Sequence, residues 1–542
     1  MINTITGCTY LQMVESGINN VQKNKQMLND LNVFPVPDGD TGTNMAMTLK
    51  YGMGGFVEND SLELAAKSFA SFAVFGARGN SGVILSQFLK GVAEGFDGYH
   101  SADTTVFFNA LKKGCEFAYA SVAKPVEGTM LTVIREAIEA VEPKMPLESF
   151  QDLLALFTTM AESSLRETPN KLPVLKKAGV VDSGGAGIVC FFDGMAKYLS
   201  GQVVDSFEDH DNQTVVDFSS INKDTPLDYG YCTEGLIQLK IDVSDFQIEE
   251  FRQELSQLGT SVVCTLEVDK VKMHVHTKKL DKVFRFCQKF GEFLTIKIEN
   301  MSVQKLQNKA EETRKFLVSE QMGEDFNIVV VASNPYLQKE FVNMGADVVI
   351  MSEITPASQD YIDAFSHTNA KEVLVFPNGS NAILTAIQAG GLVRDKKITV
   401  INSRSMAECM LALPVIDFDG TVDDAFEAVN QVINNCSKAF VYHAVKEITF
   451  GKDQVRKNDF FSMANSKQII TIQETLDKAV LETVKIVLSQ REASLITIFY
   501  GDGMAEEYID YLSKKITSLG LDVEINAVCT MEGFYSIVLT FE

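Results

Sequence analysis

The chain has 542 residues, of which 46% are hydrophobic and 22% charged, and its formal net charge is −24 at pH 7. A globular chain of this length is too long for one core, so we expect about three domains. The acidic balance argues against a nucleic-acid-binding protein, which would carry clustered lysine and arginine. Nine scattered cysteines, no membrane-length apolar stretch and no signal sequence predict a cytoplasmic protein without integral membrane contact.

Residues 1–201 are expected to form an all-α domain, because their apolar residues recur at helical spacing. One such stripe consists of Leu62, Ala65, Phe69, Phe72 and Ala73. Ser61 directly precedes this stripe and is a candidate N-cap. Residues 202–226 are rich in Asp, Ser, Asn and Thr and predict a linker.

Residues 227–302 are expected to form a small α+β domain. Its predicted strands are 233–243, 261–277 and 294–298, and its predicted helices are 246–258 and 281–290. Residues 303–325 predict a charged linker helix. From 326 to 542 apolar strands alternate with helices, which is typical of an α/β domain. The first strands are expected at 327–332, 347–351, 372–376 and 398–401. The tail from residue 494 predicts a second lobe.

Asp38 and Asp40 lie one residue apart in a turn rich in proline and glycine. Gly39 and Gly42 allow the backbone to bend so that both carboxylates converge. Two carboxylates that share a site repel each other unless a cation lies between them, so this spacing favours Mg²⁺ and a phosphate-bearing substrate. An ordinary surface turn is the alternative, because Pro, Asp and Gly dominate turns in general.

Two glycine clusters also precede helical segments. Residues 76–82 read G-A-R-G-N-S-G and come before a predicted helix at 83–96. A glycine-rich turn that opens a helix exposes N–H groups suited to a phosphate, to which Arg78 and the Ser81 hydroxyl could add contacts. The spacing fits neither a Walker A loop nor a Rossmann turn, and a tight helix–helix connection is the alternative. Residues 182–187, D-S-G-G-A-G, form the other cluster.

Four motifs together resemble the nucleotide-binding domain of the dihydroxyacetone kinase family. They are P-V-P-D-G-D-T-G-T-N-M, G-A-R-G-N-S-G, K-P-V-E-G-T-M-L-T-V and V-V-D-S-G-G-A-G. Across all three expected domains the order of motifs is similar to that of the fatty acid kinase catalytic-subunit family. The resemblance implies an antiparallel helical barrel whose mouth holds Mg²⁺ against the phosphates of ATP.

The resemblance also implies roles for individual residues. Asp38 and Asp40 would hold Mg²⁺. Arg78 is a candidate catalytic residue on its charge alone, because it could neutralise the transferring group. The implied nucleotide-binding residues are Thr41, Thr43, Asn44, Gly79, Asn80, Ser81, Gly82, Thr129, Met130, Asp182, Gly184 and Gly185. Dihydroxyacetone kinases place a third aspartate where this chain has Val33, and a histidine where it has Thr41. The number of Mg²⁺ ions and the third ligand are therefore open.

The middle segment offers a separate set of candidate ligands. His274 and His276 are two residues apart on a predicted strand, so both imidazoles point to one face, and Cys232 directly precedes another strand. Two nitrogens and a thiolate suit Zn²⁺. The alternative is that these are ordinary core residues, because a buried Cys is usually a small hydrophobe. The resemblance implies that all three positions are required, as zinc ligands or as catalytic groups.

The turn at 376–381 joins a predicted strand to a predicted helix. It could bind an anion at the start of the helix, but a capped turn is the better interpretation. The C-terminal domain resembles a degenerate form of the family's fatty-acid-binding partner fold. It lacks the glycine-rich run expected near 351–358, so we do not expect lipid binding by this domain.

The function expected from these features is Mg-ATP-dependent phosphorylation of the carboxylate of a fatty acid held by a separate α/β carrier protein. The product would be an acyl phosphate for phospholipid synthesis. A carboxylate is already ionised near neutral pH, so it needs no general base. The alternatives are a dihydroxyacetone or small-polyol kinase, a nucleotide-binding scaffold without turnover, and a metallohydrolase built on Cys232, His274 and His276. The resemblance further implies a homodimer.

Overall fold

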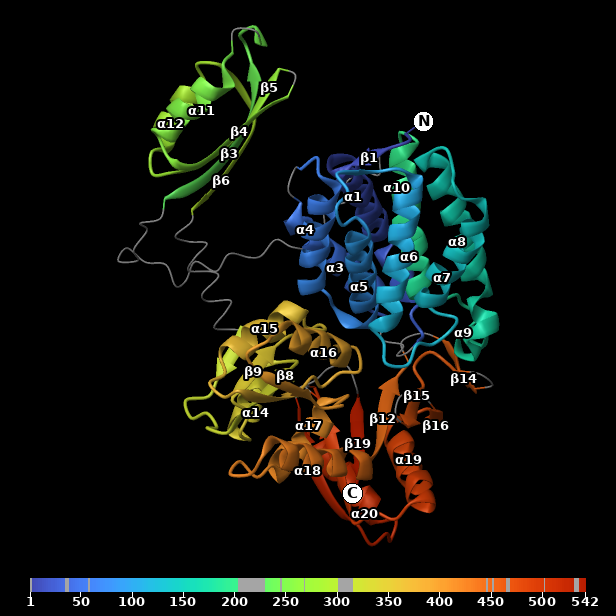
Figure 1. Ribbon diagram of the computed structural model, residues 1–542. Helices are drawn as coiled ribbons and strands as arrows, with labels where there is room; N and C mark the ends of the chain where they lie inside the picture. The colour runs from blue at the N-terminus through green and yellow to red at the C-terminus, as the bar shows by residue number, and fades with distance from the viewer. Residues whose placement is uncertain are drawn as a thin grey trace. The chain divides into compact units, whose positions relative to one another are not determined.

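The structure is a computed structural model of the chain (Figure 1). It describes residues 2–34, 39–56, 59–202, 230–243, 246–267, 269–300, 315–444, 447–450, 453–464, 468–501, 503–530 and 536–542. The chain divides into two compact units. One comprises Met1–Glu208 and Phe316–Glu542, and the other comprises Asp209–Lys315. The predicted linker at 202–226 lies outside the described residues except for its first position.

The first part of the chain is helical, as its apolar periodicity predicts (Figure 1). Its helices are α1 (Gly7–Lys23), α2 (Lys25–Asp30), α3 (Thr41–Gly52), η1 (Met53–Gly55), α4 (Leu62–Phe75), α5 (Gly79–Gly95), α6 (Thr104–Ala120), α7 (Met130–Val141), η2 (Glu142–Lys144), α8 (Phe150–Lys171), α9 (Pro173–Ala178) and α10 (Ser183–Leu199). One short antiparallel pair, β1 (Ile5–Thr6) with β2 (Ser101–Ala102), accompanies them.

The predicted stripe on α4 is confirmed in four of its five positions. Leu62, Ala65, Phe69 and Ala73 are buried. Phe72 is 41% exposed, because its ring packs at the surface against Tyr51, with the ring centroids 6.5 Å apart. Ser61 occupies the N-cap position as predicted, although its side chain makes no capping hydrogen bond.

The helices pack as neighbouring pairs around one apolar core. The pair α1 and α10 approaches closely because glycine lies at the crossing. A Cβ atom at Gly194 would lie 2.5 Å from the main-chain oxygen of Ser16 and 2.7 Å from the Cα atom of Gly17. Such a contact requires a residue without a side chain. The finer expectation of an antiparallel helical barrel stays a prediction.

The described residues of the middle unit form a four-stranded antiparallel sheet in the order β4-β5-β3-β6 with two helices (Figure 1). Its elements are β3 (Tyr231–Leu239), α11 (Ile248–Ser256), β4 (Thr260–Glu267), β5 (Lys270–Thr277), α12 (Leu280–Cys287) and β6 (Gly291–Asn300). The single strand predicted at 261–277 is wrong. The polar residues around Asp269 interrupt the apolar alternation, and β4 pairs back on β5 as a hairpin.

The C-terminal part begins with a five-stranded sheet in the order β11-β10-β8-β9-β7. Strands β8 (Phe326–Ala332), β9 (Val348–Met351), β10 (Glu372–Phe376) and β11 (Lys397–Val400) run parallel, and β7 (Phe316–Val318) is an antiparallel edge. The four parallel strands were predicted. The linker helix expected through residue 325 is wrong at 316–318, because Phe316 is buried against the sheet as part of β7.

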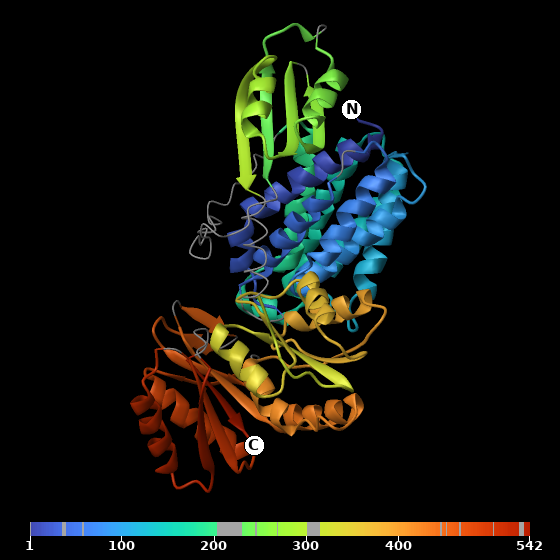
Figure 2. The ribbon, with the colours of Figure 1, turned by 90° about the vertical axis from the view of Figure 1, so that its left-hand side faces the viewer.

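Both faces of this sheet are covered by helices (Figures 1 and 2). One layer contains α14 (Pro335–Asn343), α17 (Met406–Ala412), η5 (Leu413–Val415) and α18 (Val422–Asn435), and the other contains α15 (Ser358–Ser366) and α16 (Ala382–Leu392). Ile328 and Val330 contribute to one apolar cluster, while Val329 and Val331 contribute to the other. Burial on both faces explains the continuous apolar run of β8.

The second lobe is a six-stranded mixed sheet in the order β16-β15-β12-β19-β17-β18. It contains β12 (Ser437–His443), β15 (Phe460–Ala464), β16 (Gln468–Gln473), α19 (Leu476–Gln490), β17 (Leu495–Tyr500), α20 (Glu506–Thr517), β18 (Glu524–Cys529) and β19 (Ile537–Phe541), beside a small hairpin of β13 (Ile448–Phe450) and β14 (Asp453–Val455). The predicted order after residue 494 is confirmed. The lobe begins earlier than predicted, because β12 pairs with β19 and lies in the middle of the sheet.

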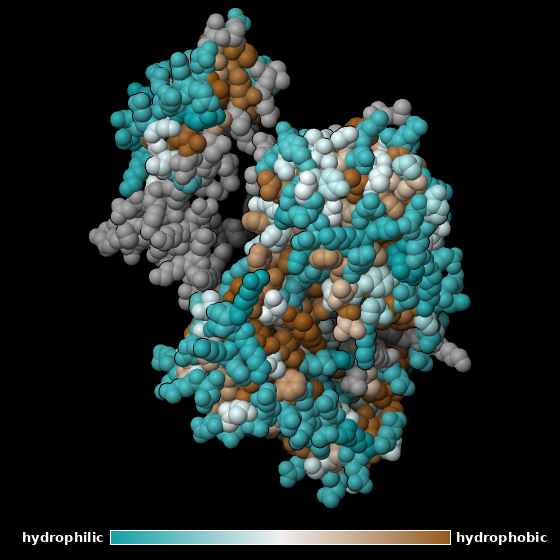
Figure 3. Space-filling model, viewed as in Figure 1, coloured by the Kyte–Doolittle hydropathy of each residue, from teal (hydrophilic) through white to brown (hydrophobic). Residues whose placement is uncertain are grey.

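The face of the molecule shown in Figure 3 is covered mostly by hydrophilic residues. This agrees with the large negative charge of the sequence. In the described ranges no helix combines the length and apolar character needed to cross a bilayer.

Candidate nucleotide and metal site

The first predicted motif leads into helix α3. Asp38 lies outside the described residues. Gly39 has a left-handed φ of +67°, a conformation that glycine adopts without steric cost. Asp40 is the N-cap residue of α3, and its main-chain oxygen accepts the first helical hydrogen bond from the N–H of Asn44 at 2.8 Å. Its carboxylate makes no capping bond within α3, so this side chain is available to groups outside the helix.

The remaining predicted residues at the start of α3 hold the turn in place. The Thr43 N–H donates to Oδ1 of Asn29 at 3.0 Å, and the Thr43 hydroxyl accepts from Nδ2 of the same amide at 3.0 Å. A Cβ atom at Gly42 would lie 2.2 Å from the main-chain oxygen of Lys25. Thr41 is buried. These contacts position Asp40 by fixing the first turn of α3 against α2.

The second motif forms the first turn of α5. Gly79 has a left-handed φ of +61°, and a Cβ atom there would lie 2.4 Å from Nδ2 of Asn44. A Cβ atom at Gly82 would lie 2.4 Å from Oγ1 of Thr48, which also accepts a hydrogen bond from the Arg78 N–H at 3.2 Å. The helix predicted to begin at residue 83 therefore begins at Gly79. The glycines lie inside the helix because α3 packs directly against its first turn.

The third and fourth motifs also meet at the starts of two helices. Asp182 is the N-cap residue of α10 and accepts a hydrogen bond from the Gly185 N–H at 2.7 Å. It also accepts from the N–H of Met130, the first residue of α7, and a Cβ atom at Gly184 would lie 3.2 Å from Sδ of Met130. Thr129 is the N-cap residue of α7. The structure thus brings Thr129 and Met130 next to Asp182 and Gly184, and the contact of these residues with a nucleotide stays a prediction.

Burial raises the pKa of Asp182 to about 6, although the two backbone N–H donors act to lower it. The side chain is only 5% exposed. Taking the charged carboxylate out of water costs more than the hydrogen bonds return. A carboxyl group with this pKa is partly protonated in mildly acidic solution.

Contacts among α3, α5, α7 and α10 bring the N-terminal ends of these four helices to the same end of the helical part. Gly79 and Gly82 of α5 contact Asn44 and Thr48 of α3, so these two helices run in the same direction. The same holds for α7 and α10, since Gly184 and Gly185 of α10 lie against Met130 and Val133 of α7. A Cβ atom at Gly187 in α10 would lie 2.5 Å from Sδ of Met45 in α3, which joins the pairs.

The positive ends of four helix dipoles therefore lie at the same end of the helical part as Asp40. The first-turn N–H groups of a helix lack acceptors within the helix and favour anions. The N–H groups of Thr43, Met130 and Gly185 already donate to Asn29 and Asp182. The other first-turn N–H groups would offer donors to phosphate oxygens without a cluster of lysine and arginine side chains. This arrangement explains how a strongly acidic chain could bind a polyphosphate.

Residues of the C-terminal part contact this end of the helical part. The Nδ2 atom of Asn381 donates to both carboxylate oxygens of Asp40, at 3.3 and 3.2 Å. The Oδ1 atom of Asn381 accepts from Nδ2 of Asn80 at 2.9 Å. The sequence indicated the turn that contains Asn381 but no role for this residue. Its contact with Asp40 spans 341 positions of the chain, and no local pattern signals it.

The Arg78 side chain also contacts the C-terminal part. Its guanidinium donates to the main-chain oxygen of Thr355 at 2.8 Å and lies 3.6 Å from the Asp360 carboxylate. Both side chains of this ion pair are largely buried. The contact of Arg78 with a phosphate group stays a prediction, and in the structure this residue anchors the C-terminal part beside the Gly79 turn.

The described residues fit a magnesium-bound nucleotide. Asp40 offers hard oxygen ligands of the kind that Mg²⁺ prefers. An amide NH₂ group already lies against both of its carboxylate oxygens, which shows that a positively polarised partner fits there. Asp40 would hold the ion, which would supply positive charge to neutralise the phosphate groups.

The predicted zinc residues belong to two neighbouring strands of the middle sheet. Cys232 on β3 is directly opposite His276 on β5, and His274 is two positions from His276 on the same strand. The intervening Val275 and its partner Thr233 are buried in the core. The side chains of Cys232 and His274 are not among those described. Among the side chains that are described, no cluster of three or more His, Cys, Asp or Glu could hold a metal ion.

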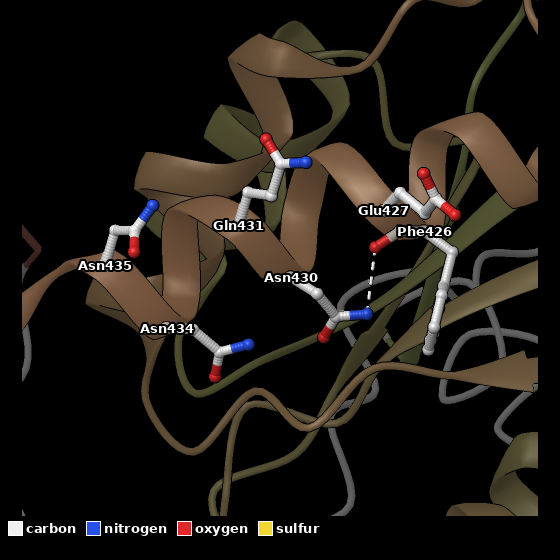
Figure 4. A pocket seen from close by; sticks show the side chains of 6 residues that line it. All are labelled: Phe426, Glu427, Asn430, Gln431, Asn434 and Asn435. Atoms are coloured by element: carbon white, nitrogen blue, oxygen red, sulfur yellow. Dashed lines mark hydrogen bonds between the residues drawn. The ribbon is translucent and has the colours of Figure 1, made fainter.

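A hollow on the surface lies along α18 (Figure 4). It is lined by Phe426, Glu427, Asn430, Gln431, Asn434 and Asn435. All of these residues come from one helix, and Asn430 donates to the main-chain oxygen of Phe426 at 2.9 Å. The hollow contains none of the predicted site residues, so we assign it no catalytic role.

Comparison with known proteins identifies the family. Residues 35–197 match the DAK2 domain. Residues 228–308 match the middle domain and residues 327–542 the C-terminal domain of the FakA-like family, which is described as similar to the A-subunit of fatty acid kinase. A protein of Staphylococcus aureus strain bovine RF122 / ET3-1, described as uncharacterized, is 31% identical over 541 residues, with 97% of each chain covered. The chain belongs to the FakA-like fatty acid kinase family.

Two solved structures resemble parts of this FakA-like chain. The dihydroxyacetone kinase from C. freundii in complex with AMP-PNP and Mg²⁺ is 19% identical, covers 34% of this chain and 33% of its own, and has a TM-score of 0.28. The fatty acid kinase B3 protein of Streptococcus pneumoniae loaded with linoleic acid is 14% identical, covers 40% of this chain and 99% of its own, and has a TM-score of 0.30.

Proposed function

We propose that this chain is a Mg-ATP-dependent kinase that transfers the γ-phosphoryl group of ATP to the carboxylate of a fatty acid. The fatty acid would be held by a separate fatty-acid-binding protein of α/β fold, and the product would be an acyl phosphate used in phospholipid synthesis. The observation that carries the proposal is that four helices begin at one end of the helical part, where Asp40 caps one of them, in a chain of this family.

The residues support a transfer dominated by charge neutralisation. The attacking carboxylate is already ionised and needs no base, so the main barrier is the approach of one anion to another. Asp40, together with Asp38, would hold Mg²⁺. The N–H groups around Gly79 and Gly184 would bind phosphate oxygens and orient the γ-phosphoryl group.

A carrier protein has a physical reason in this scheme. A long acyl chain exposes apolar surface to water, which is unfavourable by about 0.8 kcal/mol per CH₂ group. In the parts of the chain that are described, the main apolar clusters are filled by the protein's own side chains. We therefore assign the acyl chain to the partner and only the carboxylate to this site.

Three further features belong to the proposal. Cys232, His274 and His276 hold a zinc ion; the pairing of Cys232 with His276 on neighbouring strands supports this. The chain forms a homodimer. Its domains extend over residues 1–201, 227–302 and 326–542, with linkers between them.

Trapping of the product tests the reaction. The protein is incubated with Mg-ATP, hydroxylamine and oleate bound to a fatty-acid-binding protein purified from the source cell. Hydroxylamine converts an acyl phosphate to an acyl hydroxamate with release of phosphate. We expect hydroxamate that requires the carrier and is lost in Asp40→Ala. ADP release with dihydroxyacetone and without any carrier, in the absence of hydroxamate, would show that the substrate is a small polyol.

A further inference from the structure

Asn381 has an unusual position for an N-cap residue. It precedes α16 with φ −79° and ψ −22°, and its side chain makes no capping bond to its own helix. Instead, its amide group joins two predicted site residues of the helical part. Nδ2 lies 3.2 and 3.3 Å from the Asp40 carboxylate oxygens, and Oδ1 lies 2.9 Å from Nδ2 of Asn80.

Neighbouring contacts hold Asn381 at this position. Gln388, two turns further along α16, donates to the main-chain oxygen of Val74 at 2.9 Å and to the Ser358 hydroxyl at 3.1 Å. The Ser358 N–H donates to the main-chain oxygen of Ala77 at 3.1 Å. These bonds involve neither Asp40 nor Asn80. The location of Asn381 is therefore fixed by an interface that does not depend on its own amide group.

Among the described residues, Asp40 is not part of any cluster of three or more His, Cys, Asp or Glu side chains. Mg²⁺ requires six oxygen ligands in near-ideal octahedral geometry, so further oxygen ligands must come from other groups. An amide oxygen is a suitable hard ligand. Neighbouring ligands of an octahedral Mg²⁺ at about 2.1 Å are about 3 Å apart. The amide tip of Asn381 is 3.2 Å from one oxygen of Asp40, which is close to this spacing.

A turn of the amide group changes its role without moving the backbone. The oxygen and nitrogen of an asparagine amide are nearly equal in size, and a 180° rotation of the group exchanges them. In the structure, the NH₂ group faces the carboxylate. With a cation on Asp40, the amide oxygen faces it instead, and a matching turn of Asn80 preserves their mutual hydrogen bond.

We propose that Asn381, from the C-terminal domain, is an oxygen ligand of the Mg²⁺ ion that Asp40 holds. This inference rests on the proposed function of the Asp40 site. It makes the kinase site a composite of two domains, since the helical domain supplies the carboxylate and the C-terminal domain supplies the amide. The C-terminal domain thereby acts directly in nucleotide-metal binding.

Binding of Mn²⁺, followed by electron paramagnetic resonance in the presence of AMP-PNP, tests the proposal without turnover. We expect Asn381→Ala to weaken Mn²⁺ binding by about tenfold or more. Asn381→Asp is expected to retain or tighten binding, because a carboxylate oxygen replaces the amide oxygen. The matched control is Gln388→Ala, which removes contacts of the same interface but touches neither Asp40 nor Asn80; it should bind Mn²⁺ within about twofold of the unmodified chain.

Unchanged Mn²⁺ affinity in Asn381→Ala would overturn the proposal, because Asn381 would then serve only the interface. Tighter binding in Asn381→Ala would also overturn it, since the amide would be a competitor of the metal. An equal loss in Gln388→Ala and Asn381→Ala would show that the effect comes from the interface and not from a ligand. Asp40→Ala separates this inference from the proposed function: unchanged Mn²⁺ binding in that variant would refute the metal site itself.

Discussion

Replacement of Asp182 by asparagine tests the electrostatic description of the nucleotide end. The carboxylate is 5% exposed and caps α10 by accepting the Gly185 N–H at 2.7 Å. Burial is the largest influence on its charge and raises its pKa to about 6. An asparagine has nearly the same shape, and its amide oxygen can accept the same N–H group. Asp182→Asn should therefore keep the cap and remove the buried charge.

The magnitude follows from the pKa difference. The pKa of a free aspartate is 3.8, and the pKa of Asp182 in the folded chain is about 6. A difference of about 2.2 units, at 1.36 kcal/mol per unit, corresponds to about 3 kcal/mol. Because the folded pKa is the higher one, protonation favours the folded state, and this stability is lost as the pH rises from about 4 through about 6. Asp182→Asn should be more stable than the unmodified chain by about 3 kcal/mol at pH 8 and by about half of that at pH 5.

Hydrogen exchange measured by mass spectrometry gives the local opening free energy of α10. Peptides from this helix should exchange about a hundredfold more slowly in Asp182→Asn than in the unmodified chain at pH 8, with a smaller difference at pH 5. Asp103→Asn is the matched control, because Asp103 is an exposed N-cap of α6 that accepts the Val106 N–H at 2.9 Å. It should change exchange little at either pH, since Asn and Asp are similar N-caps. Faster exchange in Asp182→Asn, or a difference that does not depend on pH, would refute the reasoning.

Three further predictions concern other parts of the chain. Gly79→Ala should lower the free energy of unfolding by at least about 1–2 kcal/mol, because φ is +61° and the new Cβ would lie 2.4 Å from Nδ2 of Asn44; calorimetry should show an earlier melting transition. Lys438→Met should cost about 3–5 kcal/mol, since it leaves the buried carboxylate of Glu408 without its ion-pair partner; chemical denaturation checks this, and equal stability would show that the pair contributes nothing. Purified protein should contain zinc that His276→Ala lacks, which metal analysis by plasma emission measures; equal zinc content in both proteins would exclude His276 as a ligand.

Regular elements could be predicted because their causes are local. The stripe on α4 and the continuous apolar runs of β8 and β10 each reflect a repeating pattern of burial. The failures occur where a partner decides the outcome. Nothing in the run 261–277 shows that it pairs with itself as a hairpin. Likewise, Phe72 follows the helical period but lies outside the buried face.

The candidate site was predictable as a set of motifs but not as a geometry. Glycine at positions 79 and 82 indicated a close approach, yet only the structure shows that Asn44 and Thr48 of α3 are what approaches. Asn381 could not be assigned from the sequence at all. Its turn has the composition of an ordinary cap, and its contact with Asp40 depends on how two parts of the chain pack.

Because the chain is strongly acidic, binding of a phosphate group requires a local source of positive charge. The formal charge is −24, and the one arginine of the predicted motifs, Arg78, is paired with Asp360. A phosphate group at this end would therefore be bound mainly by backbone N–H groups and by a metal ion. Such donors lie at short range in a fixed geometry and are screened less by salt than exposed charges. Nucleotide binding should consequently depend strongly on the divalent cation and weakly on ionic strength. A site that draws a metal ligand from each of two domains would also bind the nucleotide only when those domains are in contact.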